Sequence, residues 1–197
     1  MGSRIFLGNG WFIQSSAKVK EEGAEVSSAA FSPVQWYPAV VPSTILAALV
    51  NNGVYPDPYY GNNLRDIRPE PFEIPWWYRT AFGLPNDCRG KNIRLHFGGI
   101  NYRADVWLNG RKVADSKQMV GTYLSFEFDI SDKVLLGQSN VLGVEVFPPT
   151  VNDLKITWYD WGPWPPDLNM GIWQLVYVEV SGWGDIERPH VVTALPL

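Results

Sequence analysis

The sequence is poor in the residues on which metal sites and thiol chemistry depend. Its 197 residues include one Cys and two His. A closed zinc site needs about four Cys or His ligands, so this set is too small to build one. The single thiol, Cys88, excludes an internal disulfide, and only His96 and His190 are available to it as a catalytic base. We therefore expect no metal, no other cofactor and no catalytic Cys.

Positive charge and long apolar runs are also scarce. The chain has 16 Lys and Arg against 20 Asp and Glu, a formal net charge of -4, and no basic run exceeds Arg111 and Lys112. Nucleic acid binding needs a basic surface to neutralise phosphates, so we expect no nucleic acid partner. No stretch approaches the ~20 apolar residues of a membrane span, and the first residues lack the apolar segment of a signal peptide. We expect no membrane partner, and the compartment stays unassigned.

The length sets a further limit. A catalytic (β/α)₈ barrel takes about 250 residues, more than the 197 present. We therefore expect a single domain over residues 1–197. A domain of this size buries roughly 70% of its unfolded surface, so it can fold without disulfides. Hydrophobic residues make up 46% of the chain and charged residues 18%, which favours a globular domain over disorder.

Alternation of apolar and polar residues dominates the sequence from residue 76 onward and indicates strands. The expected strands are 77–82, 93–97, 104–108, 123–130, 141–147 and 172–180. Between them, the pair Asn109 and Gly110 predicts a hairpin joining strands 103–108 and 111–115, because both residues tolerate positive φ. Such half-buried antiparallel strands predict an all-β fold, a jelly-roll β-sandwich.

One short helix is expected near residues 43–51. It opens with a Ser or Thr cap at 43–44 and closes at Gly53. Four apolar residues in it share one face, which suits a helix that plugs the end of a sandwich: Ile45, Leu46, Leu49 and Val50.

An aromatic, Pro-rich segment, 157–173, holds the strongest candidates for ligand binding. Three of its four Trp, Trp158, Trp161 and Trp164, alternate with carboxylate and amide side chains, among them Asp160 and Asn169. A sugar ring packs its apolar C–H face on Trp, and its hydroxyls hydrogen-bond to carboxylates and amides. The alternative is that the Trp residues close the open end of the sandwich and that the polar residues satisfy backbone donors in turns. The residues alone leave both interpretations open.

A second segment, 55–63, has a similar mixture of aromatic, Asp and Asn residues. Its Pro-Asp and Gly-Asn-Asn sequences are ordinary turn formers, so we interpret it as turns. A pair of glycosidase carboxylates is recognised by its separation in space, which no spacing in this sequence specifies, so we assign no catalytic residue.

Seven motifs occur in an order that resembles glycoside hydrolase family 2. They are DPYYGNN (57–63), WWYRTAF (76–82), GINYRADVWLNG (99–110), FDI (128–130), NVLGVEVFPP (140–149), YDWGPWPPDLNMGIW (159–173) and ERPHVVTAL (187–195). As a set they look like the N-terminal sugar-binding domain of the exo-β-D-glucosaminidase and β-mannosidase branches.

The resemblance implies a galactose-binding-like jelly roll. In complete family members an immunoglobulin-like domain and a catalytic barrel follow, and the barrel supplies both catalytic glutamates. Neither glutamate can be placed on this sequence. We therefore expect the chain to be the N-terminal fragment of a larger glycosidase that hydrolyses terminal β-linked glucosamine or mannose. Its partners would be the carbohydrate substrate and the remaining domains of that enzyme.

The resemblance also points to particular substrate-binding residues. Asp160 and Trp161, in the YDWG string, are the first choices for hydroxyl binding and ring packing, and Asp167 and Asn169 come second. Gly162 follows Trp161 as in the mannosidase branch, whereas the continuation PPDLNMGIW looks like the glucosaminidase branch. Which of the two sugars is bound therefore stays open. Two other hypotheses are an independent, lectin-like carbohydrate-binding module and a chain that is an enzyme by itself.

Overall fold

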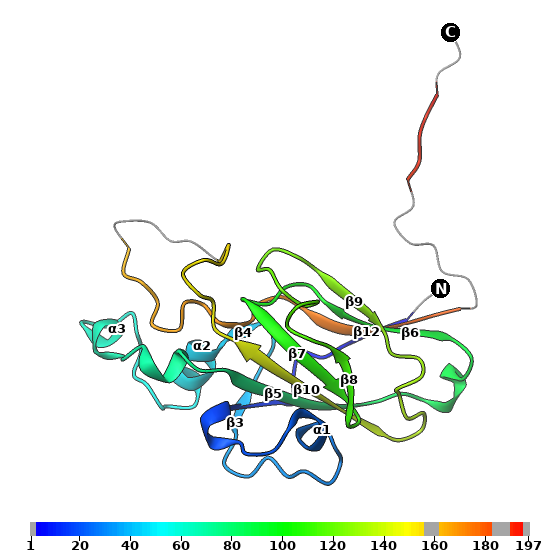
Figure 1. Cartoon of the computed structure of the whole chain (residues 1–197), viewed down its shortest axis with the longest axis horizontal. Coiled ribbons are helices and arrows are strands. Elements are labelled where there is room, and N and C mark those ends of the chain that lie inside the picture. Colours follow the sequence, from blue (N-terminus) through cyan, green and yellow to red (C-terminus); the bar gives the residue numbers. More distant parts are fainter. Residues whose placement is uncertain (1–2, 156–161, 183–189, 195–197) are drawn as a thin grey trace.

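The computed structural model of the chain describes residues 3–155, 162–182 and 190–194. They form two antiparallel sheets with the order β1-β12-β6-β9 and β3-β2-β5-β10-β7-β8, and a small pair, β11-β4 (Figure 1). The four-stranded sheet contains β1 (Ser3–Phe6), β12 (Val176–Ser181), β6 (Asn92–Phe97) and β9 (Phe126–Asp129). The six-stranded sheet contains β3 (Tyr37–Ala39), β2 (Trp11–Ser15), β5 (Trp76–Gly83), β10 (Ser139–Phe147), β7 (Arg103–Leu108) and β8 (Arg111–Ala114).

The remaining elements are short. The pair at the end of the sandwich is β4 (Ser43–Thr44) with β11 (Gly171–Ile172). The α-helices are α1 (Gly23–Val26), α2 (Ile45–Asn51) and α3 (Asn63–Asp66), and three 3-10 turns lie at η1 (Ser16–Lys18), η2 (Glu70–Phe72) and η3 (Asn86–Cys88). No helix within the described residues is long and apolar enough to cross a membrane.

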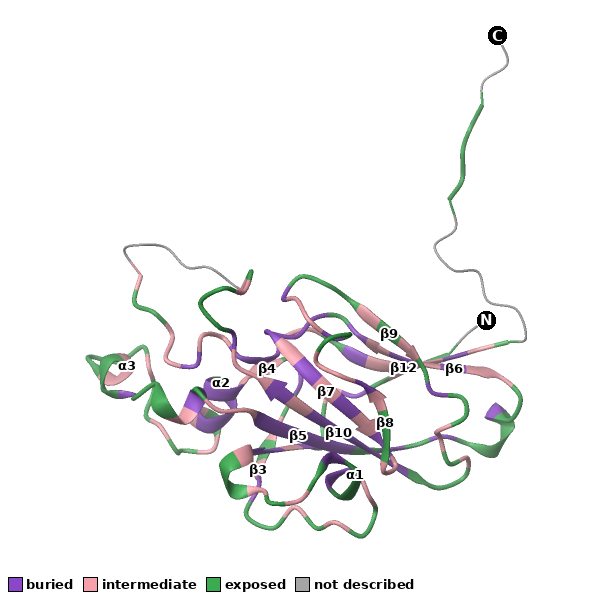
Figure 2. Ribbon diagram, in the orientation of Figure 1, coloured by how far each residue is buried: buried purple, intermediate pink, exposed green. Residues whose placement is uncertain are grey.

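The main core lies between the two large sheets (Figure 2). In β6 and β7 every second side chain is buried, as alternation on a pleated strand requires. Leu95 and Phe97 from the four-stranded sheet join the same apolar cluster as Val106 and Val144 from the six-stranded sheet. The two inner faces therefore pack on each other, and the all-β sandwich prediction is confirmed.

A second, smaller core covers the outer face of the six-stranded sheet. Trp76 and Trp77 are neighbours in β5, so they point to opposite faces, and Trp77 joins a cluster with Val26 and Trp36. Helix α1 approaches this face closely: a Cβ on Gly23 would lie 2.2 Å from Cε2 of Trp107. Gly is needed at position 23 because a side chain there would collide with the indole.

The hairpin prediction is confirmed, and two strand predictions need correction. β7 and β8 pair antiparallel, and the turn residues Asn109 and Gly110 have φ of 51° and 80°. The strand expected over 123–130 starts only at Phe126, because Tyr123 and Leu124 project into solvent. The strand expected over 172–180 is interrupted, because the chain pairs first with β4 and only then joins the four-stranded sheet as β12.

The helix prediction is confirmed with a later start. Helix α2 begins at Ile45, and the Thr44 hydroxyl caps it by accepting a hydrogen bond from Ala47 N at 3.2 Å. The buried residues of α2 include Ile45, Leu46 and Leu49, while Val50 is half-buried. The sequence pattern did not predict the one-turn helices α1 and α3 or the strands β1, β2 and β3.

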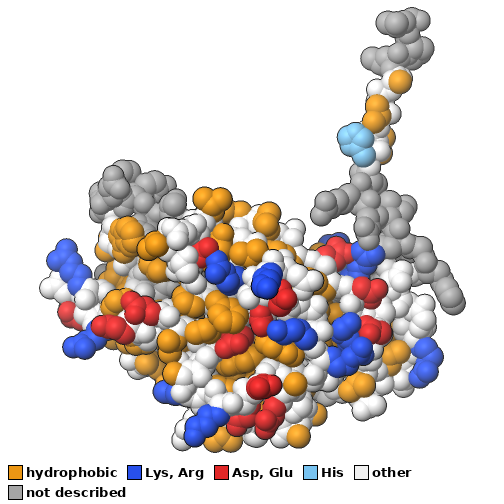
Figure 3. Space-filling model, in the orientation of Figure 1, with side chains coloured by type: hydrophobic (Ala, Val, Ile, Leu, Met, Phe, Trp, Pro, Cys, Tyr) orange, Lys and Arg blue, Asp and Glu red, His pale blue; other side chains and the backbone are white. Residues whose placement is uncertain are grey.

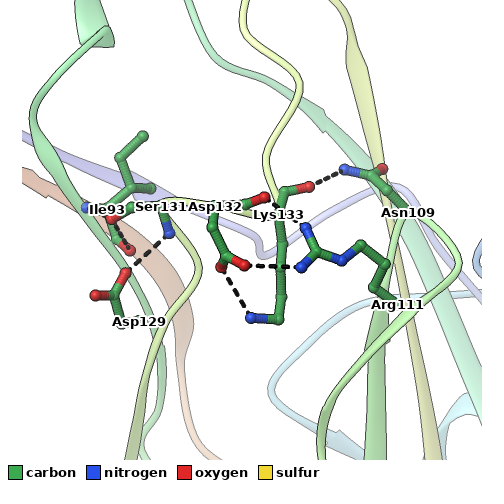
Figure 4. Close-up of polar contacts among 7 residues, drawn as sticks. All are labelled: Ile93, Asn109, Arg111, Asp129, Ser131, Asp132 and Lys133. Atoms are coloured by element: carbon green, nitrogen blue, oxygen red, sulfur yellow. Dashed lines mark hydrogen bonds and ion pairs between the residues drawn. The ribbon is translucent and has the colours of Figure 1, made fainter.

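A polar network holds the end of the sandwich where β7 turns into β8 (Figure 4). Asn109 Nδ2 donates to the Lys133 carbonyl, and Asn109 Oδ1 accepts from Val141 N, both at 2.9 Å. The Asp132 carboxylate accepts from Arg111 at 2.8 Å and from Lys133 at 2.9 Å. This end lies at the opposite end of β7 from the loops described below.

On the outer face of the four-stranded sheet, His96 lies between two carboxylates. Its ring stacks on Tyr177 at 4.5 Å, with Nδ1 3.5 Å from Glu127 Oε2 and Nε2 3.3 Å from Glu179 Oε2. Burial lowers the pKa of His96 from its ordinary value; the two glutamates oppose this shift, and Arg4 and Arg94 assist it. The His96 ring therefore stays neutral down to a lower pH than the side chain of a free His does.

Candidate functional site

Three segments from different parts of the chain meet at the end of the sandwich where β7 begins. Helix α2 supplies one wall, residues 57–64 a second, and residues 163–169 a third, and they enclose a cavity of about 650 Å³. A cavity of this volume accommodates a small-molecule ligand. The lining residues are Thr44, Leu46, Ala47, Val50, Asn51, Asp57, Pro58, Tyr59, Leu64, Pro163, Pro165, Asp167 and Asn169. On the face shown in Figure 3, hydrophobic side chains spread from this end across the middle of the molecule, and charged side chains lie beside them at this end.

A second cavity, of about 590 Å³, lies on the other side of the segment 163–168. Leu64 and Pro165 line both cavities, and the side chain of Trp164, which is 64% exposed, lines the second. The Pro-rich segment is therefore a partition with a cavity on each side, and it presents an accessible indole.

Asp167 lines the first cavity, yet its carboxylate is 1% exposed and bonded to the protein backbone. Its Oδ2 accepts from Leu46 N, in the first turn of α2, and its Oδ1 accepts from Asn169 N, each at 3.0 Å. The Thr44 side chain also hydrogen-bonds to it. Burial raises the pKa of Asp167, and these hydrogen bonds oppose the shift. The carboxylate ties the Pro-rich segment to the start of helix α2.

Asn169 lies on the same wall, and its backbone has φ of 57°, in the left-handed region. Its carbonyl accepts from the Asn101 side chain, and its N–H donates to Asp167. Within the described part of the chain, the hydrogen bonds of Asn169 are made by its backbone. The side-chain amide is thus available to a ligand in the cavity.

The other two predicted binding residues, Asp160 and Trp161, lie outside the described residues. The structure therefore brings Asp167 and Asn169 to one cavity and leaves the first two choices as predictions. That any of the four contacts a sugar also stays a prediction.

The residues 57–63, which the sequence indicated only as turns, contribute a wall of the same cavity. They do form a turn, since Asp57 Oδ1 accepts from Tyr59 N at 2.9 Å. Asp57 and Tyr59 nevertheless line the cavity, and the Tyr59 side chain is 95% exposed. Their mixture of aromatic, carboxylate and amide groups matches that of segment 157–173, and this was the signal that could have identified them.

In the described part of the chain, no three or more His, Cys, Asp or Glu side chains lie where they could share a metal ion. What the cavity offers instead is a tyrosine ring, a carboxylate and amides on a frame that includes three prolines, Pro58, Pro163 and Pro165. Proline limits the freedom of an unbound loop, so less order has to be imposed when a ligand binds.

Comparison with known proteins places the chain in a family. A family model for the glycosyl hydrolase 2 galactose-binding domain-like domain matches residues 11–157. The chain belongs to this family. The galactose-binding-like sandwich implied by the sequence motifs is thereby confirmed.

The chain is similar over nearly all of its length to glycoside hydrolases of this family. It is 40% identical to the exo-beta-D-glucosaminidase of Amycolatopsis orientalis over 187 residues, which are 94% of this chain and 18% of that protein. The solved structure of the Amycolatopsis orientalis exo-chitosanase CsxA superimposes with a TM-score of 0.83 at 39% identity, covering 92% of this chain and 21% of that one. A beta-D-mannosidase from Dictyoglomus thermophilum superimposes with a TM-score of 0.66 at 25% identity, covering 92% and 23%.

These alignments also show that the matched proteins are several times longer than this chain. The galactose-binding-like chain spans about a fifth of the length of the proteins it matches. It therefore corresponds to only a part of each of them.

Proposed function

We propose that this chain is the non-catalytic N-terminal domain of an exo-acting family 2 glycosidase and that it lends loop residues to the pocket for the terminal sugar. The complete enzyme hydrolyses terminal β-linked glucosamine residues, with β-linked mannose as the second candidate substrate. Asp160, Trp161 and Asn169 are the proposed sugar-contacting residues. Asp167 borders the same cavity and is the fourth candidate.

One observation carries the proposal. The chain aligns over 94% of its length with an exo-beta-D-glucosaminidase of which it represents only 18%. A complete enzyme of this kind must therefore contain many residues besides these 197, which are fewer than the ~250 that a catalytic barrel takes.

The cavity supports the choice of an amino sugar. A glucosamine residue carries an ammonium group near neutral pH, and the exposed carboxylate of Asp57 on the cavity wall is suited to a charge-assisted hydrogen bond with it. Tyr59 and the amide of Asn169 offer a ring face and a hydrogen-bonding group to the rest of the sugar.

The decisive experiment compares the complete protein, expressed from the reading frame that contains this chain, with the 197-residue chain alone. We expect the complete protein to release 4-nitrophenol from 4-nitrophenyl β-D-glucosaminide faster than from the β-mannoside. We expect the chain alone to release none. Hydrolysis by the 197-residue chain, or a complete protein inactive on both substrates, would contradict the proposal.

An independent lectin-like module is the second hypothesis, and the relatives named above, which are glycosidases several times longer, do not support it. Calorimetric titration of the isolated chain with glucosamine, mannose and chitosan fragments distinguishes the two. Binding at millimolar concentration or tighter would favour the module. Absence of heat with all three would favour a domain that completes a pocket formed with the rest of the enzyme.

A further inference from the structure

A buried asparagine outside the cavity holds the segment that forms one of its walls. Asn101, which is 0% exposed, lies just before β7 and does not line either cavity. Its Nδ2 donates to the Leu168 carbonyl at 2.8 Å and to the Asn169 carbonyl at 2.9 Å. One amide group thus uses both of its donors on consecutive residues of the Pro-rich segment.

The backbone of Asn101 adds a second attachment to the same segment. Asn101 N donates to the Gly171 carbonyl at 2.9 Å, and Gly171 N donates back to the Asn101 carbonyl at 3.0 Å. The remaining side-chain atom, Oδ1, accepts from the buried hydroxyl of Thr122 at 2.9 Å. Every polar group of Asn101 is therefore bonded, and four of its five hydrogen bonds go to residues 168–171.

The conformation held in this way is an unusual one. Leu168 and Asn169 both lie in the left-handed region, with φ of 49° and 57°. Non-glycine residues adopt that region at a cost and persist there only when surrounding contacts impose it. The two carbonyls that Asn101 binds belong to these two residues, so the amide is well placed to impose it.

We infer that Asn101 is a positioning residue for the sugar pocket. It fixes the backbone of Leu168 and Asn169, so that the Asn169 side chain and the Pro-rich wall face the cavity. It acts through the 163–169 segment and does not contact the sugar. The inference rests on the proposed function, because the effect is read through the binding of a terminal sugar by the complete enzyme.

The test replaces one atom of Asn101. In Asn101→Asp the shape and Oδ1 are retained, but a carboxylate oxygen replaces the Nδ2 donor and faces two carbonyl oxygens. Misplacement of a binding group by about 1 Å costs on the order of 100-fold in rate. We therefore expect kcat/KM for 4-nitrophenyl β-D-glucosaminide to fall by about 10- to 100-fold in the complete enzyme, with most of the loss in KM.

Asn140→Asp is a matched control. Asn140 is also 0% exposed, and its Nδ2 also donates to two backbone carbonyls, those of Leu135 and Gln138, but at the far end of β7. Both Asp variants should unfold at lower urea concentration than wild type. The control should keep kcat/KM within about twofold of wild type at a temperature where circular dichroism shows all proteins folded.

A milder variant covers the case in which Asn101→Asp does not fold. Thr122→Val keeps the shape of the side chain and removes only the hydroxyl that donates to Asn101, so we expect a KM increase of about two- to fivefold. Unchanged KM in Thr122→Val, or unchanged kcat/KM in Asn101→Asp, would overturn the inference, as would an equal loss in Asn140→Asp. A wild-type enzyme inactive on both substrates would instead refute the proposed function, so the two failures are distinct.

Discussion

Asp167 should be one of the most costly carboxylates to remove from this chain. Its two oxygens accept from Leu46 N and Asn169 N, each at 3.0 Å, within a site that is 1% exposed. Asp167→Ala leaves both N–H groups without their acceptor, and it also removes the side chain that joins α2 to the Pro-rich segment.

The expected magnitude follows from the burial of the two bonds. A buried donor left unsatisfied costs about 1–3 kcal/mol. The bond to Leu46 is buried and the bond to Asn169 is partly accessible, so the full penalty applies to one donor and a fraction to the other. Burial raises the pKa of Asp167 because it disfavours the charged carboxylate. Removing the carboxylate therefore also removes this desolvation cost, which offsets part of the stability lost with the two hydrogen bonds. We expect Asp167→Ala to lower the free energy of unfolding by about 2–3 kcal/mol, and Asp167→Asn, which keeps one acceptor oxygen, by about 1 kcal/mol.

The assay is urea unfolding of the chain at pH 7, followed by tryptophan fluorescence. The matched control is Asp115→Ala, because Asp115 Oδ1 also accepts from two backbone N–H groups, at 2.9 and 3.1 Å, but at an exposed turn. That variant should lose clearly less stability than Asp167→Ala, because water can satisfy the exposed N–H groups. If Asp167→Ala is no less stable than Asp115→Ala, the carboxylate does not hold the segment and the reasoning is wrong.

Three further predictions concern other parts of the molecule. Burial lowers the pKa of His96 from 6.5, so on acidification the unfolded chain protonates this imidazole before the folded chain does. The free energy of unfolding should therefore fall as the pH drops below about 6.5. Urea titrations at several pH values should show that the free energy of unfolding depends less on pH in His96→Gln than in the wild type. Gly23→Ala places a methyl group against Trp107 and should cost about 1–3 kcal/mol in urea unfolding while sparing KM in the complete enzyme, so an unaffected stability would refute the collision. Asp160→Ala should raise KM of the complete enzyme for the glucosaminide at least about tenfold, as expected for a lost charged hydrogen bond, and unchanged kinetics would show that Asp160 does not bind the sugar.

The sequence predicts those strands whose two faces have different surroundings. β6 and β7 have one face in the core and the other half-exposed, so their alternation is visible in the sequence. β2 lacks such alternation because it is covered on both sides: Trp11 and Ile13 join the main core, while Gln14 is buried on the other face. β1 is short and mostly exposed, so it shows no apolar period either.

The candidate site is only partly visible in the sequence for a related reason. The composition of segment 157–173 fits ligand binding as well as a structural role, and the structure places Asp167 and Asn169 on a cavity wall. The hydrogen bond from Leu46 to Asp167 could not be predicted, because Leu46 lies 121 residues away in the chain. The same holds for Asn101, whose hydrogen bond to Asn169 spans 68 residues and lies beside the bridge between Asn101 and Gly171.

The most direct test of the account is a crystal structure of the complete protein with a glucosamine-configured ligand in its active site. We predict that at least one side chain from residues 57–63 or 160–169 lies within hydrogen-bond distance of the terminal sugar, about 3.2 Å or less. We also predict that Asn101 remains hydrogen-bonded to the Leu168 and Asn169 carbonyls and does not touch the ligand. A terminal sugar held entirely by residues outside this chain would contradict the central claim.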